Sequence, residues 1–382
     1  NVSVLAARSL VLSGTADIRT SSTSAGSGSI DAVAGTGGIT QRATSLITST
    51  GATATARLVA GTDVTVGDIV LGTGKVSITA TAGAILDADS SNDVEQNITA
   101  SALRLNAGMG IAQSANHLET TVGTLSARAG DGSIYVLEAD ALTVGDVGLS
   151  VNRVASDAST AAGSSTDVAQ SDIRTTGGNG NIVLRTTAGS ITLNNGTAPN
   201  DDTAISANGT GNILIQALGA DTDITVNADI VSGSGNVSVL AAASIVLTGT
   251  ADIRTSSTAA GSGSMDVLAG TGSIAQSATS VFLSTGATAT ARLLAATDVT
   301  VGDIELTLGK VSITATSGSI LDADGLVSSA NDADQDVTAS ALRLFAGTGI
   351  AENVNHLETT VVTLSARAGN GSIYVLEAND LI

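Results

Sequence analysis

The sequence GTGNILIQA at residues 209–217 is followed by GSGNVSVLA at residues 233–241, so one pattern returns after 24 residues. Each stretch opens with two glycines one residue apart and continues with alternating apolar residues, such as Ile213 and Ile215. Alternation with a period of two places these side chains on one face of a β-strand. Glycine suits the turn before such a strand, because it accepts a positive φ at which a Cβ would clash. The pattern therefore predicts short strands joined by tight turns.

The pair of glycines recurs along the whole chain. It begins at Gly26, Gly72, Gly130, Gly178, Gly209, Gly233, Gly261 and Gly369. The last three intervals before the sequence repeats itself are 31, 24 and 28 residues, the length of one coil, and the earlier intervals of 46 to 58 residues fit two coils each. The marker fades in residues 35–65 and 146–176, where the coil boundaries stay open.

Three strand-like stretches fill the first coil: Val2–Leu5, Leu10–Leu12 and Ala16–Thr20. About three short strands per coil, repeated along the chain, are typical of a parallel β-helix. We therefore predict an all-β fold, a parallel β-helix or β-solenoid. Its interior should hold layers of Val, Ile, Leu and Ala, because the chain has only two Phe, two Tyr and no Trp.

Three asparagines stand at the same phase of neighbouring coils, just before an inward strand: Asn181, Asn212 and Asn236. Stacked asparagine side chains can hydrogen-bond from coil to coil, as they do in cross-β ladders. Asparagine also tolerates turn conformations on its own account. The sequence leaves both interpretations open.

A second, longer repeat covers most of the chain. Residues 1–142 return as residues 236–381 with about three in four positions identical, and the one large insertion is four residues near Gly325. We therefore divide the chain into a first long repeat, residues 1–235, and a partial second copy, residues 236–382. Because each repeat buries its apolar face against its neighbours, we expect one continuous rod without a true domain boundary, cut from a much longer protein.

The composition excludes several classes of function. The formal net charge is −20 and the only lysines are Lys75 and Lys310, which argues against nucleic acid and anionic lipid as partners. No apolar run approaches the roughly 18 residues that span a bilayer. Cysteine is absent, and a long solenoid takes its stability from stacking and needs no disulfides.

Acidic loops are the best candidates for a binding site. Asp87-Ala88-Asp89 opens one loop, and Asp322-Ala323-Asp324 opens its equivalent in the second copy. Alternating carboxylates suit Ca²⁺, which takes six to eight oxygen ligands, although the spacing fits neither an EF-hand nor the calcium-binding nonapeptide repeat. A solvated acidic loop is the alternative, so Ca²⁺ is the one cofactor considered and otherwise none is expected. The candidate ligands are Asp87, Asp89, Asp93, Asp322, Asp324, Asp332, Asp334 and Asp336.

Catalysis finds little support in the sequence. His117 and His356 are repeat equivalents, and a pair of His117 with Glu119 would lie on one face of a strand, as acid–base chemistry requires. No nucleophile and no convergent polar set accompanies that pair, so we expect surface or turn histidines and no enzyme. A polysaccharide lyase would need basic and aromatic residues that are scarce here, and Thr-x-Thr pairs are too sporadic for ice binding.

The Gly-x-Gly-[Asn/Ser]-Ile-x-Leu coils, the Ala/Thr/Ser-rich turns, the lack of Cys and the long repeats resemble filamentous-haemagglutinin-like exoproteins. The resemblance covers the whole chain and implies a right-handed parallel β-helical shaft, located outside the cell or on a bacterial cell surface, that serves adhesion or cell–cell contact. It transfers no binding residue, because the shaft repeats have none defined.

We therefore expect a structural shaft, a rigid spacer of a giant bacterial adhesin or extracellular fibre. Its expected partners are neighbouring repeats of the same chain, other fibre chains, or a host or partner cell surface. The alternatives are a polymerising fibre subunit and a calcium-dependent binding module that uses the acidic loops.

Overall fold

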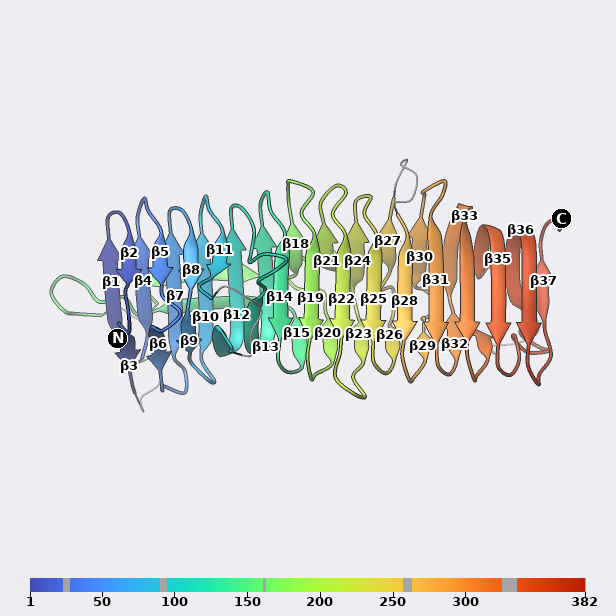
Figure 1. The fold of residues 1–382 in the computed structure, drawn as a ribbon, viewed down its shortest axis with the longest axis horizontal. Helices are drawn as coiled ribbons and strands as arrows, with labels where there is room; N and C mark the ends of the chain where they lie inside the picture. The colour runs from blue at the N-terminus through green and yellow to red at the C-terminus, as the bar shows by residue number, and fades with distance from the viewer. Residues whose placement is uncertain (23–27, 90–94, 161–162, 257–262, 325–334, 382) are drawn as a thin grey trace. The chain divides into compact units, whose positions relative to one another are not determined.

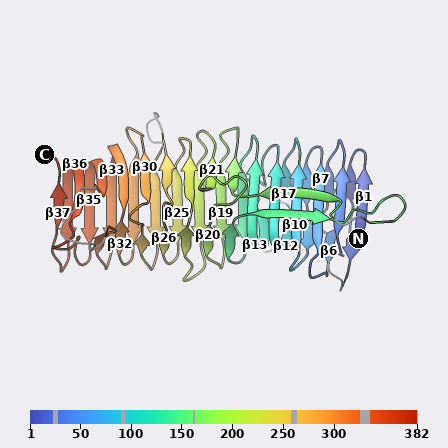
Figure 2. The same cartoon turned by 180° about the vertical axis from the view of Figure 1, so that it is seen from behind.

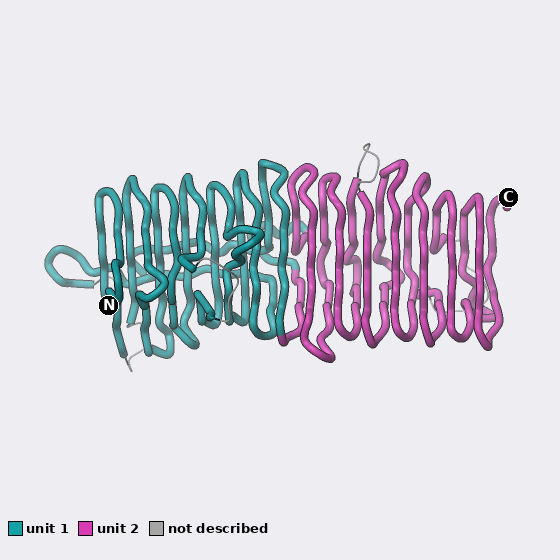
Figure 3. Tube along the Cα trace, viewed as in Figure 1, with its two compact units in different colours: residues 1–187, 195–201 teal, residues 188–194, 202–382 magenta. Residues whose placement is uncertain are grey.

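The computed structural model of the chain describes residues 1–22, 28–89, 95–160, 163–256, 263–324 and 335–381. These residues form two compact units, shown in Figure 3: unit 1 consists of residues 1–187 and 195–201, and unit 2 of residues 188–194 and 202–382. Within the described ranges the secondary structure is strands and turns, and no helix there could cross a membrane.

Unit 1 contains the first 19 strands (Figure 1). They are β1 Val2–Ala6, β2 Leu10–Leu12, β3 Ile18–Thr20, β4 Ile30–Ala34, β5 Ile39–Gln41, β6 Leu46–Ser49, β7 Thr55–Ala60, β8 Val64–Val66, β9 Asp68–Val70, β10 Lys75–Ala80, β11 Ile85–Asp87, β12 Ile98–Ala107, β13 Leu118–Ala129, β14 Ile134–Glu138, β15 Leu142–Val144, β16 Val147–Val151, β17 Ser165–Gln170, β18 Ile173–Thr175 and β19 Ile182–Thr186.

Unit 2 contains the strands from β20 onward. They are β20 Ile191–Leu193, β21 Thr203–Ala207, β22 Ile213–Ala217, β23 Ile224–Val226, β24 Asp229–Ser232, β25 Val237–Ala241, β26 Ile245–Leu247, β27 Ile253–Thr255, β28 Met265–Ala269, β29 Ile274–Ala275, β30 Val281–Ser284, β31 Thr290–Ala295, β32 Val299–Val301, β33 Asp303–Ala315, β34 Ile320–Asp322, β35 Val337–Ala346, β36 Leu357–Ala368 and β37 Val375–Glu377.

The coils of unit 1 pair in parallel, each strand with its equivalent one coil further along. Val2 of β1 pairs with Ile30 of β4, and Ile30 pairs with Ala56 of β7. The same ladder continues through β10, β12 and β13. A second ladder joins β2, β5, β8 and β11, and a third joins β3, β6 and β9. Three parallel ladders confirm the predicted parallel β-helix with three short strands per coil.

Unit 2 has the same architecture. One ladder runs through β22, β25, β28, β31 and β33, and a second through β20, β23, β26, β29, β32 and β34. The third joins β21, β24, β27, β30 and the first residues of β33. Long strands such as β33 run through a corner, and the pairing of β33 with β35 shifts register between Leu306 and Lys310.

The core of each unit consists of the inward residues of the alternating strands. In β25, Val237, Val239 and Ala241 are buried, whereas Ser238 and Leu240 between them are partly exposed. The inward residues are almost all Ile, Val, Leu and Ala, as the composition predicts, with Phe282 the largest fully buried side chain among the described residues. Burial of each Val, Leu or Ile side chain stabilises the fold by about 1.5–3 kcal/mol relative to exposure.

Short polar side chains hold the corners in register. The backbone N–H of Asn236 donates to Oδ1 of Asn212 at 2.8 Å, and the N–H of Ser264 donates to Oδ1 of Asn236 at 3.0 Å. Of the two interpretations left open, hydrogen bonding from coil to coil is found in unit 2, but the asparagine side chains accept backbone N–H groups of the next coil rather than bonding to one another. In unit 1 the N–H of Asn181 donates instead to Oγ of Ser133, at 2.9 Å.

The chain leaves the coil in the segment where the glycine marker fades. β16 and β17 form an antiparallel hairpin between β15 and β18, and Figure 2 shows it lying across the strands of unit 1. β16 packs against β7, β10, β12 and β13. Val147, Leu149 and Val151 face this sheet and are buried, whereas Val168 of β17 is 72% exposed. We call residues 147–170 the strap hairpin.

We predict that Gly130→Ala destabilises unit 1 by about 1–3 kcal/mol, the usual cost of overpacking. A Cβ at Gly130 would overlap the carbonyl oxygen of Gly108 in the preceding coil. Gly145→Ala is the matched control, because a Cβ there meets nothing nearer than a threonine methyl group at 3.8 Å. Urea unfolding should show a lower midpoint for the first variant only, and equal midpoints for both would contradict the tight packing of the corner.

Candidate functional site

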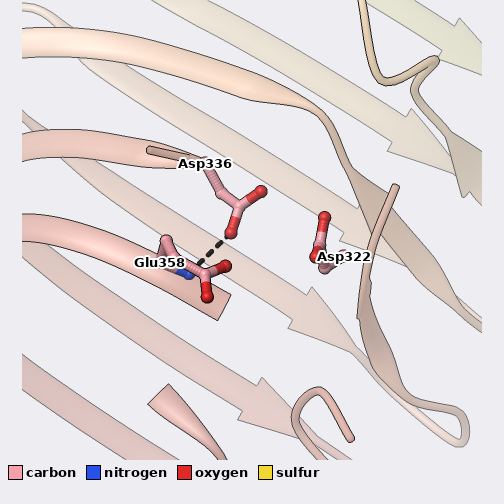
Figure 4. Close-up of side chains that lie close together, drawn as sticks. All are labelled: Asp322, Asp336 and Glu358. Carbon is pink, nitrogen blue, oxygen red and sulfur yellow. Dashed lines mark hydrogen bonds between the residues drawn. The ribbon is translucent and has the colours of Figure 1, made fainter. Parts of the chain in front are cut away.

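Three carboxylates from two neighbouring coils of unit 2 converge at one corner. Asp322 ends β34, Asp336 directly precedes β35, and Glu358 is the second residue of β36. One oxygen from each lies within 4.8 Å of the others, and Figure 4 shows the three side chains facing one another. Asp336 is 3% exposed and Glu358 is 2% exposed, so the cluster lies largely out of water.

Burial and mutual repulsion set the protonation of this cluster. The backbone N–H of Glu358 donates to Oδ2 of Asp336 at 2.6 Å. Burial, reinforced by the nearby Asp322 carboxylate, raises the pKa of Asp336 well above its ordinary value. A neutral Asp336 carries a proton that it can donate to Asp322, which removes one of two adjacent negative charges.

At the same corner, the first copy of the repeat has an amide in place of one of the three carboxylates. Its equivalent residues are Asp87, Asn97 and Glu119, so Asn97 stands where the second copy has Asp336. Nδ2 of Asn97 donates to Oδ1 of Asp87 at 2.7 Å, and Oδ1 of Asn97 accepts the N–H of Glu119 at 2.9 Å. A protonated Asp336 reproduces both hydrogen bonds, because its hydroxyl takes the part of the amide N–H.

The cluster could also bind a cation. Carboxylate oxygens are the ligands that Ca²⁺ prefers, but three side chains supply fewer than the usual six to eight oxygen atoms. Backbone carbonyls or water would have to complete the shell. The arrangement of Asp322, Asp336 and Glu358 therefore accommodates either a shared proton or a partly hydrated cation.

The structure brings together only part of the predicted calcium set. Asp322 and Asp336 meet in the cluster, whereas Asp324 donates its backbone N–H to Oδ1 of Asp322 at 2.8 Å. Asp89 makes the equivalent contact with Asp87 at 3.0 Å. The remaining candidates lie outside the described residues: Asp93, Asp332 and Asp334.

Sequence reasoning did not nominate Glu358. Its signal was present in the long repeat, where Asn97 changes to Asp336 beside an unchanged glutamate, Glu119 in one copy and Glu358 in the other. Only the stacking of coils shows that this one change places three carboxylates together.

The two histidines stack on tyrosines. His117 follows a turn, one of the two positions expected for it, and it is only 5% exposed, so it does not lie on the surface. Its ring stacks on Tyr135 with centroids 5.6 Å apart, and His356 stacks on Tyr374 at 5.7 Å. Burial, with a smaller effect of Arg185, lowers the pKa of His117 and favours the neutral ring.

A further buried carboxyl titrates near neutral pH. Burial raises the pKa of Glu138 to about 7, although Oγ1 of Thr120 donates to it at 2.7 Å and the N–H of Val122 at 3.0 Å. Glu377, its equivalent, accepts the matching bonds from Thr359 and Val361. These carboxyls tie neighbouring strands together and are not members of the three-carboxylate cluster.

We predict that Asp336→Asn raises the stability of unit 2 at pH 8 by about 1 kcal/mol or more, since each pKa unit is worth about 1.4 kcal/mol. The folded chain holds a proton that the unfolded chain releases above a pH of about 4, so stability falls as pH rises towards the folded pKa. The variant binds no proton at residue 336, so its stability lacks this fall with rising pH. The pH dependence that Glu138 causes is the same in both proteins.

Hydrogen exchange of the amides in β34 and β35 between pH 5 and 8 measures the effect. Asn97→Asp is the reverse test, because it should create the same pH dependence in β11 and β12. If the difference in stability between Asp336→Asn and the native chain does not change with pH, then Asp336 holds no proton.

Comparisons with known proteins give no match. No family model, no curated protein and no solved structure matches this chain. The expected likeness to filamentous-haemagglutinin-like exoproteins therefore stays a prediction, and the fold stands on the strand pairing described above.

Proposed function

We propose that this chain is a structural shaft, a stiff β-solenoid spacer of a giant bacterial adhesin or extracellular fibre on the cell surface or outside the cell. The observation that carries the proposal is the coil-to-coil ladder within each unit. Among the described residues of each unit, neighbouring coils bond to each other through parallel strands, and polar side chains such as Asn212 and Asn236 extend that bonding into the corners.

The physical basis of stiffness is that bending or stretching a coil must disturb a whole row of parallel hydrogen bonds at once. A continuous aliphatic core beneath each row adds to that resistance. The net charge of −20 makes neighbouring shafts repel one another and so opposes non-specific aggregation. The proposed partners are neighbouring repeats of the same chain, other fibre chains, or a host or partner cell surface.

Stretching a single chain between its termini tests the shaft. We expect no extension at low force and then abrupt steps as coils detach. A coil of 24 residues, the spacing of Ile213 and Val237, would release about 80 Å at about 3.5 Å per residue. The same chain in urea is the control and should lengthen smoothly. Smooth, low-force lengthening in buffer would remove the proposal.

A calcium-dependent binding module is the second candidate, and the cluster of Asp322, Asp336 and Glu358 favours it. In this proposal a cation, rather than a proton, neutralises the corner, and the acidic loops contact a partner.

We predict that millimolar Ca²⁺ raises the stability of unit 2 more at pH 8 than at pH 5, because protons compete for the same carboxylates. The gain reaches about 2.7 kcal/mol at a hundred times the dissociation constant. Asp336→Asn should abolish the gain without unfolding the chain, since Asn97 fills this position in unit 1. A calcium-insensitive unfolding curve for the native chain would eliminate this candidate.

A further inference from the structure

The strap hairpin is held on unit 1 by ion pairs. Nε of Arg153 lies 2.5 Å from Oδ2 of Asp31, and Nη1 of Arg57 lies 3.1 Å from Oδ1 of the same aspartate. Nε of Arg57 also donates to Oδ1 of Asp167 at 2.8 Å, and Oγ of Ser77 donates to Oδ2 of Asp167 at 2.6 Å. These contacts fix the two arms of the hairpin over β4, β7 and β10.

An open cavity of about 530 Å³ lies between the hairpin and the coils. The coils line it with residues 52–55 and 73–75, and the hairpin lines it with residues 148–150 and 166–169. Its volume falls within the range of small-molecule binding sites, about 300–1,000 Å³. Because β7 pairs with β4 and β10 pairs with β12, coils lie on both sides of the cavity, and it is not at an end of the ladder.

Much of the lining is apolar. Leu149 of the hairpin and Ala54 of the coils contribute to it, and they are 6% and 1% exposed. Val168 lines the cavity from the other arm of the hairpin and is 72% exposed, the largest fraction among the large apolar side chains of the described residues. A ligand with an apolar body would remove this surface from water, which favours its binding.

The hydroxyl groups of the lining bond largely to one another and to the backbone. Oγ1 of Thr73 donates to a backbone carbonyl oxygen at 3.2 Å, and the hydroxyl groups of Ser150 and Thr166 lie 2.7 Å apart. The hydroxyl group of Thr55 lies 3.1 Å from Oγ of Ser29. The lining therefore suits an apolar ligand better than one rich in hydroxyl groups, such as a sugar.

The charge of the lining favours an anion. Among the described residues that line the cavity, Lys75 and Asp167 are the charged ones, and Asp167 is neutralised by Arg57. Lys75 takes part in none of the ion pairs between described residues. Its ammonium group is therefore the uncompensated charge of the cavity, in a chain whose net charge is −20.

We propose that this cavity binds a small amphiphilic anion, a carboxylate with an aliphatic chain. The carboxylate pairs with Nζ of Lys75, and the aliphatic chain lies against Leu149 and Val168. The site requires the docked hairpin, because the hairpin and the coils each supply part of its wall.

Octanoate is the probe, and calorimetry with the full chain measures its binding. We expect one octanoate bound per chain, since the cavity occurs once. Acetate carries the same head group without the chain and should not compete with octanoate. Lack of octanoate binding would overturn the site, and competition by acetate at equal concentration would overturn the role of the aliphatic chain.

Lys75→Glu tests the head group. It should weaken octanoate binding at least about fivefold, because it replaces an attraction by a repulsion. Binding of octanol, which has the same chain without the charge, should stay within about twofold, which also shows that the variant is folded. Lys310→Glu is the matched control, because Lys310 is the equivalent of Lys75 in the second copy and does not line the cavity.

Val168→Asp tests the aliphatic chain. It should weaken the binding of octanoate and of octanol alike, because it places a charge against an apolar ligand. Val11→Asp is the matched control, since Val11 is also exposed, at 58%, but lies on β2 outside the cavity.

Three further outcomes would each overturn the site. They are octanoate binding that does not respond to Lys75→Glu, binding that falls equally in Lys310→Glu, and binding that falls equally in Val11→Asp. Ligand binding does not require the shaft function, which the stretching experiment tests separately.

Discussion

The hydrogen bond between one coil and the next is the constraint on which the rest of this protein depends. A coil such as β1 to β3 has no other partner for its backbone, so every strand must lie in register with its equivalent in the neighbouring coil. Close approach at the corners then excludes a Cβ at positions such as Gly130. It also favours short side chains, such as Asn212, whose oxygen reaches the backbone of the next coil.

That constraint explains what the sequence could predict. Alternating apolar residues identify an inward face, and glycine pairs identify corners, so the class of fold follows from local patterns alone. Local patterns do not predict the strap hairpin, because Val147, Leu149 and Val151 alternate like the inward residues of any coil. Their position across the coils involves the contact of Asp167 with Arg57, 110 residues away in the chain, which no local pattern encodes. The carboxylate cluster also depends on stacking, since Asp336 and Glu358 come from neighbouring coils.

The two copies of the repeat stabilise the same buried polar corner in two different ways. Asn97 brings its own N–H and donates it to Oδ1 of Asp87, so this hydrogen bond needs no proton from the solvent. Asp336 must obtain a proton or a cation from the solvent, because two buried carboxylates that both ionise repel each other in a medium of low polarity. Replacing the amide of Asn97 by the carboxyl of Asp336 thus converts a hydrogen bond that is independent of the solvent into one that depends on pH or on a bound cation.

Comparing equivalent ion pairs on the outer surface of the two copies shows which pairs affect stability and which affect specificity. An exposed pair such as Arg292 with Asp266 contributes little to stability, because water and salt screen it. The equivalent pair of Arg57 with Asp31 is buried beneath the strap hairpin, where an unmatched charge would be costly. Burial is tolerated there because Arg153 and Asp167 supply opposite charges at the required positions. A hairpin without those two residues would bury the pair of Arg57 with Asp31 and leave it with fewer ionic and hydrogen-bond partners, so the added contacts favour a segment that carries them. The outward polar row of a solenoid strand can therefore act as a recognition surface while the inward row, unchanged, maintains the fold.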